Sequence, residues 1–316
     1  MSDRATAAAT TAAAAARLLD RPLRVADVGC RWGFADAWQR LGDAVEITGF
    51  DPDAEECVRL RERYSSQANV EIVALALSAR VEHRSVQLTS EPVCSSFFAP
   101  DRVVLEQIAD LAIMRPVGAV EVQTSTLDQW RADTGRGLVD FIKADVQGAE
   151  AEVLRGANRT LSDVVVMELE VEFNPLYEGQ ALFSEVDSVA RSHGFQLWRL
   201  SNLAHYTRGV PRPHVATPDV QFCDSHPAHL GALGGQLFWG HALYVAADVV
   251  EGRSEDWQRP LRAGCLAAAL ELPDLALHAW SVAAALAVEP ERAGIAAALD
   301  GYAASVLPND RPLDSR

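Results

Sequence analysis

From Leu23 to about residue 200, short runs of apolar and β-branched residues alternate with amphipathic stretches of helical spacing. This alternation is typical of a parallel β-sheet with helices on both faces. The predicted strands are Arg24–Val28, Val45–Phe50, Val70–Leu75, Val139–Ala144, Val164–Leu169 and Phe195–Leu200. The predicted helices are Phe34–Leu41, Ala54–Ser66, Ala149–Leu161 and Ser184–Ser192. Their order predicts an α/β fold with a doubly wound sheet.

Two segments interrupt this alternation. Arg80–Phe98 alternates polar and apolar residues, which predicts a hairpin, and a helix at Val103–Leu111 and an extended Ala119–Thr124 are predicted after it. We expect them to extend the sheet or to roof its carboxyl end. Arg208–Gly235 is rich in Pro, Gly and His without a period, which is typical of a lid or of disorder. The apolar run Leu237–Ala246 predicts an antiparallel strand that closes the sheet.

The two ends of the chain differ in composition from its middle. Residues 1–20 are rich in Ala and Thr and predict an N-terminal extension. The segments Asp256–Leu270, Leu275–Ala287 and Glu291–Val306 are rich in Ala and Leu at helical spacing. We therefore expect an α/β domain at residues 21–248 and a helical C-terminal appendage at 249–316, which packs on that domain or links subunits into a homo-oligomer.

Composition narrows the range of partners. The 316 residues contain 28 Lys and Arg against 44 Asp and Glu, a formal net charge of −16, which opposes binding to nucleic acid or anionic lipid. Five widely spaced cysteines without a Cys-x-x-Cys pair indicate a reducing compartment. The sequence also lacks a signal-peptide pattern and any run of 18 apolar residues. We predict a cytoplasmic protein that does not span a membrane.

The most informative local pattern is Val25–Gly33, a strand followed by a turn with glycines at Gly29 and Gly33. At the carboxyl end of the first strand, such glycines let a ligand approach the backbone. A dinucleotide site would have the pattern Gly-x-Gly-x-x-Gly, but Arg31 stands at the second glycine position, which disfavours NAD(P). An adenosyl cofactor without phosphates, such as S-adenosylmethionine, has a carboxylate that an arginine or a backbone N–H could bind.

Two further strand ends carry carboxylates. Asp51 follows the second strand, where its side chain can accept both ribose hydroxyls, although a lone Asp there is more often a helix cap. Asp145 ends the fourth strand at the same edge of the sheet, and Glu150 lies at the start of the next helix. Both could instead serve that helix, as its cap and as a negative charge at its amino end.

The segment Asp140-Phe-Ile-Lys-Ala-Asp-Val-Gln-Gly-Ala-Glu-Ala-Glu-Val-Leu-Arg-Gly-Ala157 resembles the FkbM family of S-adenosylmethionine-dependent methyltransferases. So do Val166-Met-Glu-Leu-Glu170, Pro175-Leu-Tyr-Glu-Gly-Gln180 and Gly194-Phe195. The similarity covers about residues 23–200.

This resemblance implies a class I methyltransferase fold, which is Rossmann-like, and O-methylation of a sugar or natural-product acceptor. It also implies cofactor contacts from Asp27, Gly29, Gly33 and Asp51, with Ala76 and Leu77 beside the adenine. Asp145 would face the methionine end of the cofactor or the acceptor. Many members have Ala-Asn where this chain has Cys30-Arg31, so Arg31 either replaces the Asn or points to solvent.

Methyl transfer to a hydroxyl needs in-line placement and removal of one proton. The candidate bases are Asp145, Glu150, Glu168 and Glu170; the last two share one face of the fifth strand by alternation. A divalent cation held by such carboxylates is the other way to lower the hydroxyl pKa, and the sequence does not separate the two.

Other polar groups give weaker signals. His226-x-x-His229, in a loop with Asp219 and Asp224, has metal-like spacing but is more often a solvated loop. The segment 94–97 could contact substrate, whereas Tyr177 and Trp198 are expected to pack. Two other functions stay open: a nicotinamide-dependent oxidoreductase on the same fold, and a non-catalytic binding or assembly protein.

Overall fold

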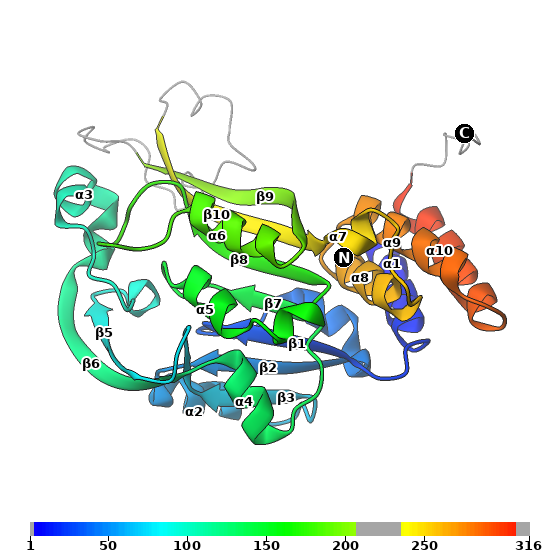
Figure 1. Cartoon of the computed structure of the whole chain (residues 1–316), viewed down its shortest axis with the longest axis horizontal. Helices are drawn as coiled ribbons and strands as arrows, with labels where there is room; N and C mark the ends of the chain where they lie inside the picture. The colour runs from blue at the N-terminus through cyan, green and yellow to red at the C-terminus, as the bar shows by residue number, and fades with distance from the viewer. Residues whose placement is uncertain (1–2, 207–234, 308–316) are drawn as a thin grey trace.

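The computed structural model describes residues 3–206 and 235–307 (Figure 1). Its main sheet has seven strands in the order β3-β2-β1-β7-β8-β10-β9. The strands are β1 (Leu23–Val28), β2 (Val45–Asp51), β3 (Val70–Ala74), β7 (Phe141–Ala144), β8 (Val166–Glu172), β9 (Phe195–Tyr206) and β10 (Gln236–Ala246). β10 lies between β8 and β9 and is antiparallel to both. The predicted doubly wound sheet with an antiparallel closing strand is confirmed.

Four α-helices cover the main sheet: α2 (Ala54–Arg63), α4 (Leu127–Thr134), α5 (Glu150–Gly156) and α6 (Phe183–Ser192). α2 begins where predicted because Asp53 accepts hydrogen bonds from the backbone N–H groups of Glu55 and Glu56. The helix predicted at Phe34–Leu41 is wrong. The chain there forms two short 3-10 helices, η1 (Asp36–Arg40) and η2 (Gly42–Ala44). The residue before η1, Ala35, has no side chain that could cap a longer helix.

A second sheet of three strands lies beyond the carboxyl end of the first, in the order β4-β6-β5. Its strands are β4 (Ala76–Leu77), β5 (His83–Thr89) and β6 (Pro116–Ser125). The hairpin predicted within Arg80–Phe98 is wrong, because β5 pairs antiparallel with the distant β6. The chain after β5 returns only to form the bridge between Gln87 and Ser96. The remaining short helices here are η3 (Pro92–Cys94), α3 (Arg102–Gln107), η4 (Ala109–Met114) and η5 (Thr160–Ser162).

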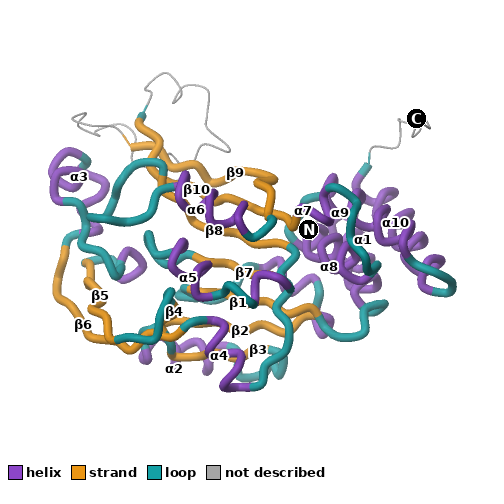
Figure 2. The backbone as a smooth tube through the Cα atoms, in the orientation of Figure 1, coloured by secondary structure: helices purple, strands orange, loops and turns teal. Residues whose placement is uncertain are grey.

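The two ends of the chain form one helical bundle. It contains α1 (Asp3–Ala16), α8 (Gln258–Ala269), α9 (Pro273–Leu286) and α10 (Glu291–Val306), preceded by the single turn α7 (Ala247–Val250). α1 packs on α8 and α10, so the N-terminal extension belongs to the same unit as the appendage. Figure 2 shows these helices together at one end of the main sheet. Within the described ranges, no helix is both long enough and apolar enough to cross a bilayer.

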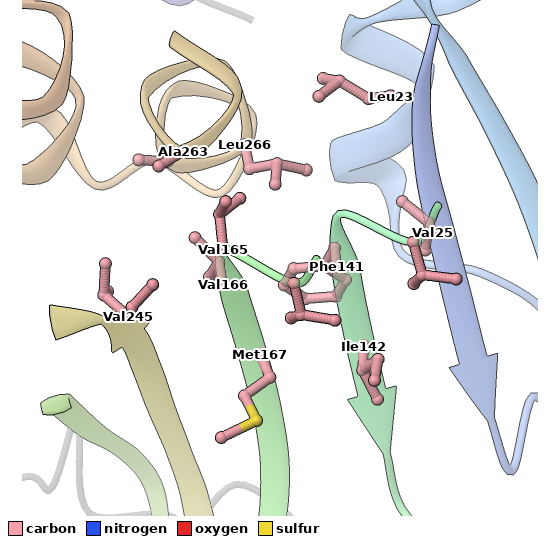
Figure 3. Packing of buried hydrophobic residues seen from close by; sticks show 14 of the residues in the cluster. Leu23, Val25, Phe141, Ile142, Val165, Val166, Met167, Val245, Ala263 and Leu266 are labelled. Carbon is pink, nitrogen blue, oxygen red and sulfur yellow. The ribbon is translucent and has the colours of Figure 1, made fainter. Parts of the chain in front are cut away.

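The bundle shares its hydrophobic core with the main sheet. Ala263 and Leu266 of α8 lie over Val165 and Phe141, at the amino ends of β8 and β7 (Figure 3). All four side chains are no more than 1% exposed. Burial at this level excludes water from the join, so the bundle and the α/β domain form one continuous core.

A buried carboxylate connects the helical bundle to the main sheet. Asp140, directly before β7, is fully buried and accepts two hydrogen bonds from the Arg21 guanidinium, at 2.7 and 2.9 Å. It accepts another from the Arg24 backbone N–H at 2.8 Å, and Arg262 of α8 lies at 3.8 Å. One side chain thus connects the segment before β1, β1 itself and α8 at the amino end of the sheet.

Candidate functional site

A cavity of about 730 Å³ opens at the carboxyl end of the main sheet. Its floor contains Gly29 and Asp145, which follow β1 and β7, and Asp51 closes one side at the end of β2. Apolar side chains from β4, β5 and β6, including Leu77 and Val86, form the opposite wall. The second sheet therefore covers the edge where parallel strands end, as the roof expected from the sequence would.

The strand register aligns the candidate residues in a row. Val28 pairs with Phe50 on β2 and with Ala144 on β7, so the next residues along, Asp51, Gly29 and Asp145, are level with one another. Ala144 pairs with Leu169, which places Glu170 of β8 next to Asp145, and Glu170 pairs with His241 of β10. We call Asp51, Gly29, Asp145, Glu170 and His241 the edge row.

The glycine turn is shaped by contacts with the protein itself. Gly29 has a φ of +83°, and a methyl group there would overlap the backbone carbonyl oxygen of Asp145. Gly33 has a φ of +99°, and a methyl group there would overlap the Tyr64 hydroxyl. These positions need glycine for backbone conformation and for space. Gly29 lines the cavity, whereas Gly33 does not.

Asp51 and Arg31 differ in their surroundings. Asp51 is 3% exposed, and one carboxylate oxygen accepts the Asp53 backbone N–H at 2.8 Å. Burial raises the pKa of Asp51, and that hydrogen bond and Arg31 oppose the rise. The guanidinium of Arg31 donates to the Asp53 carboxylate at 2.9 Å, so it does not point freely to solvent. Its Nε atom is buried and has no hydrogen-bond partner in the part of the chain that the structure describes.

The short strand β4 supplies the other cavity residues expected from the sequence. Ala76 and Leu77 line the cavity and are 4% and 3% exposed. Of the segment 94–97, Ser95, Ser96 and Phe97 line the cavity and Cys94 does not. Ser96 donates a hydrogen bond to the Gln147 backbone carbonyl at 2.7 Å, which connects this segment to the loop after β7.

Lys143 lies in the floor of the cavity, below the edge row, and was not predicted from the sequence. Its amino group lies 3.4 Å from the Asp145 carboxylate and 3.6 Å from that of Asp27. Burial alone would lower the pKa of Lys143, but the surrounding carboxylates raise it. Burial raises the pKa of Asp27 to about 6, against the attraction of Lys143. The pKa of Asp145 falls to about 2, because Lys143 and hydrogen bonds outweigh burial.

Gln147 links two of the candidate carboxylates, a contact that sequence reasoning also missed. Its amide nitrogen donates to Asp145 at 3.0 Å and to Glu170 at 2.6 Å, and its carbonyl oxygen accepts the Tyr177 hydroxyl at 2.8 Å. Tyr177 is 1% exposed, in agreement with the expected packing role. Asp145 does not cap α5, because Ala149 is the N-cap residue and no side chain bonds there.

Glu150 is placed differently from the other candidate bases. It is fully buried, and its carboxylate accepts the backbone N–H groups of Val146 at 2.7 Å and Gly148 at 3.1 Å. Burial raises its pKa to about 8. Glu150 does not line the cavity. Its contacts are those of a group that shapes the loop between β7 and α5.

Glu168 and Glu170 lie in β8, which runs two residues beyond Glu170 to Glu172. A hydrogen bond of 3.1 Å joins Oε1 of Glu168 and Nδ1 of His241. Glu172 is 1% exposed, and burial raises its pKa. Alternation along β8 would have allowed Glu172 to be predicted together with the Glu168-x-Glu170 pair. His241 could be identified only from the pairing of β10 with β8.

The cavity suits an adenosyl cofactor. Its apolar wall can take an adenine, and the Asp51 carboxylate at the end of β2 can take a ribose diol. The acidic floor around Asp145 suits a positive sulfonium. Across residues 3–206 and 235–307, no cluster of three or more His, Cys, Asp or Glu side chains could hold a metal ion. Asp219, Asp224, His226 and His229, interpreted from the sequence as belonging to a solvated loop, lie outside the described residues.

The sheet order, with its antiparallel β10 beside β8, and the cavity at the carboxyl edge define a class I methyltransferase that uses S-adenosylmethionine. The chain belongs to the FkbM methyltransferase family, since the family model described as the methyltransferase FkbM domain matches residues 27–197, more than half of the chain. This confirms the resemblance and sets the nicotinamide alternative aside.

Relatives extend this comparison. The chain is 27% identical over 198 residues to the 2-O-methyltransferase NoeI of Sinorhizobium fredii, covering 61% of this chain and 79% of NoeI. Among solved structures, it resembles the magnesium protoporphyrin IX methyltransferase of Synechocystis with bound S-adenosylmethionine (TM-score 0.34, 12% identity, 76% and 80% covered). It also resembles a putative sarcosine dimethylglycine methyltransferase of Galdieria sulphuraria (TM-score 0.37, 13% identity, 74% and 82% covered). Likenesses this distant carry no information on activity.

Proposed function

We propose that the chain transfers the methyl group of S-adenosylmethionine to a hydroxyl oxygen of a small-molecule acceptor, such as a sugar or a natural-product scaffold. The observation that carries this proposal is the edge row. It continues from the cofactor cavity through Asp145 and Glu170 to His241, so proton-accepting groups follow directly after the methyl-donor end. The similarity to NoeI, which is a 2-O-methyltransferase, supports oxygen as the acceptor atom.

The cofactor would supply an activated methyl group on a sulfonium, which needs no further activation by the protein. Asp51 would accept the ribose hydroxyls, and Gly29 would let the cofactor approach the backbone. Ala76 and Leu77 would contact the adenine, with Arg31 and Gly33 holding the surrounding turn. Asp145, kept ionised by Lys143, would face the positive end of the cofactor.

The candidate carboxylates divide into different roles in this proposal. Glu150, whose oxygens hold two backbone N–H groups, would be a positioning residue rather than a base. Asp27 would position Lys143 from below, and Glu170 would fix Gln147. Proton removal would then take place at the β8 and β10 end of the edge row. Self-association through the C-terminal helices stays a prediction, which the mass of the protein in light scattering would test.

Binding of the cofactor can be tested by isothermal titration with S-adenosylmethionine. Asp51→Asn keeps the shape of the side chain but loses its charge, so we expect affinity to fall about 10-fold or more, as for loss of a charged hydrogen bond. The matched control is Asp43→Asn, an exposed residue of η2 outside this cavity, which should bind as the wild type does. Equal binding by Asp51→Asn and wild type would refute the assignment of the ribose site.

Methyl transfer can be tested with labelled S-adenosylmethionine and a panel of acceptors. The panel would contain methyl glycosides of hexoses and deoxyhexoses, aliphatic alcohols, phenols and, as the competing class, primary amines. We expect mass spectrometry to show one added methyl group on oxygen. Transfer to amines alone, or to no member while the cofactor binds, would refute O-methylation.

A further inference from the structure

His241 occupies the outer end of the edge row and belongs to the antiparallel strand β10. It pairs with Glu170 across the sheet, and its Nδ1 atom lies 3.1 Å from Oε1 of Glu168. The side chain of His241 is 19% exposed, so it is largely enclosed but reachable. Its other ring nitrogen, Nε2, has no hydrogen-bond partner among the described residues. A carboxylate that holds Nδ1–H fixes the tautomer in which Nε2 can accept a proton.

The carboxylates of the edge row are already engaged. Asp145 is held by Lys143 and Gln147, and Glu170 by Gln147. Burial raises the pKa of Glu168, but the hydrogen bond from His241 and the charge of His241 lower it by more. The pKa of Glu168 is therefore below its usual value, and Glu168 stays ionised. An ionised Glu168 can stabilise an imidazolium, as the acid member of a carboxylate–histidine pair does.

The position of His241 suits an acceptor that sits over Glu170. Neighbouring strands lie about 4.8 Å apart, so Asp145 and His241, two strands apart in one row, have backbones about 10 Å apart. The side chains of Asp145 and His241 are 25% and 19% exposed, so a ligand can reach both. Trp239, two residues before His241, has its ring 6.1 Å from the imidazole and would border the same space.

We infer that His241, oriented by Glu168, is the general base of the methyl transfer. This inference rests on the proposed function. Nε2 takes the proton of the acceptor hydroxyl as its oxygen forms a bond to the methyl carbon. The bond from that carbon to sulfur breaks, and its electron pair stays on sulfur, which becomes a neutral thioether. Glu168 is the positioning residue that stabilises the resulting imidazolium through Nδ1–H.

The charges around His241 determine how kcat/KM depends on pH. β8 contributes Glu168 and Glu170, and β7 contributes Asp145 and Lys143. β9 places the neutral Ser201 opposite His241, with the exposed Arg199 two pairs further along, opposite Leu243. Removing the charge of Glu168 makes the imidazolium less favourable. The acidic limb of kcat/KM should therefore move to lower pH in Glu168→Gln.

The test compares His241→Asn and Glu168→Gln with the control His83→Asn, an exposed histidine at the start of β5. Titration with S-adenosylmethionine and turnover on the best acceptor of the panel above are measured for each. We expect all three to bind the cofactor within about twofold of wild type. We expect His241→Asn to lose about 10²–10⁴-fold in kcat, the usual contribution of a positioned base. His83→Asn should retain wild-type turnover.

The outcomes separate this inference from the proposed function. Wild-type turnover on a hydroxyl with His241→Asn within threefold overturns the base assignment and leaves O-methylation standing. The base assignment is also overturned if His241→Asn loses both cofactor binding and turnover. It is overturned as well if the acidic limb of kcat/KM does not move in Glu168→Gln, because a packing role would explain either result. No wild-type turnover on any hydroxyl overturns the proposed function, and this assignment with it.

Discussion

The buried carboxylate of Asp140 gives a test of how the helical bundle is held to the sheet. The change Asp140→Asn keeps the size of the side chain and removes its charge. Arg21 then loses the anion that accepts two of its hydrogen bonds, and the Arg24 backbone N–H loses a charged acceptor. Arg262 also loses its counter-charge.

The magnitude follows from the burial of this group. Asp140 is fully buried, and the side chains of Arg21 and Arg262 are 17% and 12% exposed. Breaking a buried ion pair by removing one partner typically costs about 3–5 kcal/mol, because the remaining charge stays desolvated. We therefore expect the free energy of unfolding of Asp140→Asn to fall by about 3–5 kcal/mol.

Urea unfolding followed by circular dichroism measures this loss. The control is Asp43→Asn, which removes the ion pair between Arg17 and Asp43, where the side chains are 61% and 82% exposed. Such a pair contributes little, so no resolvable change is expected. Cofactor affinity should stay unchanged in both variants, because Asp140 lies at the opposite end of the sheet from the cavity. If Asp140→Asn unfolds at the same urea concentration as Asp43→Asn, the proposed fastening role is refuted.

Two further predictions concern the site. In Gly29→Ala the added methyl group meets the Asp145 carbonyl oxygen at a positive φ, so cofactor binding and thermal stability should both fall in calorimetry. Gly42→Ala, which has a positive φ but no neighbour within 4 Å, should show only the smaller backbone cost. The pKa of Asp27 is raised to about 6, so its folded form prefers the proton and stability is lost as pH rises through that value. The free energy of unfolding of Asp27→Asn should therefore rise relative to that of wild type as the pH increases from 4 to 7, and a difference that does not change with pH would contradict this.

The parallel part of the fold could be predicted because its signal is local. Strand β1 and the glycine turn, strand β2 and Asp51, and strand β7 and Asp145 each follow from adjacent residues, and parallel strands bring their carboxyl ends to one edge. The cavity wall from β5 could not be predicted in the same way. Alternation marks β5 as a strand but does not identify its partner β6, some thirty residues further along the chain.

The candidate site shows the same division. Glu168 and Glu170 follow from alternation, but His241 joins them only through the antiparallel register of β10 with β8. Lys143 stands two residues before Asp145 on the same strand face, so alternation contained the signal for this pair. The role of Glu150 depends on the backbone of the loop at Val146 and Gly148, which no periodic pattern encodes.

The placement of β10 also bears on how the chain folds as it is made. β8 is complete at Glu172, yet one of its edges stays open until Gln236–Ala246 has left the ribosome. α1, made first, finds its partners α8 and α10 only after nearly the whole chain has been synthesised. Non-local pairing of this kind slows folding and leaves strand edges exposed. Truncation before β10 should therefore yield an aggregation-prone chain rather than a smaller methyltransferase.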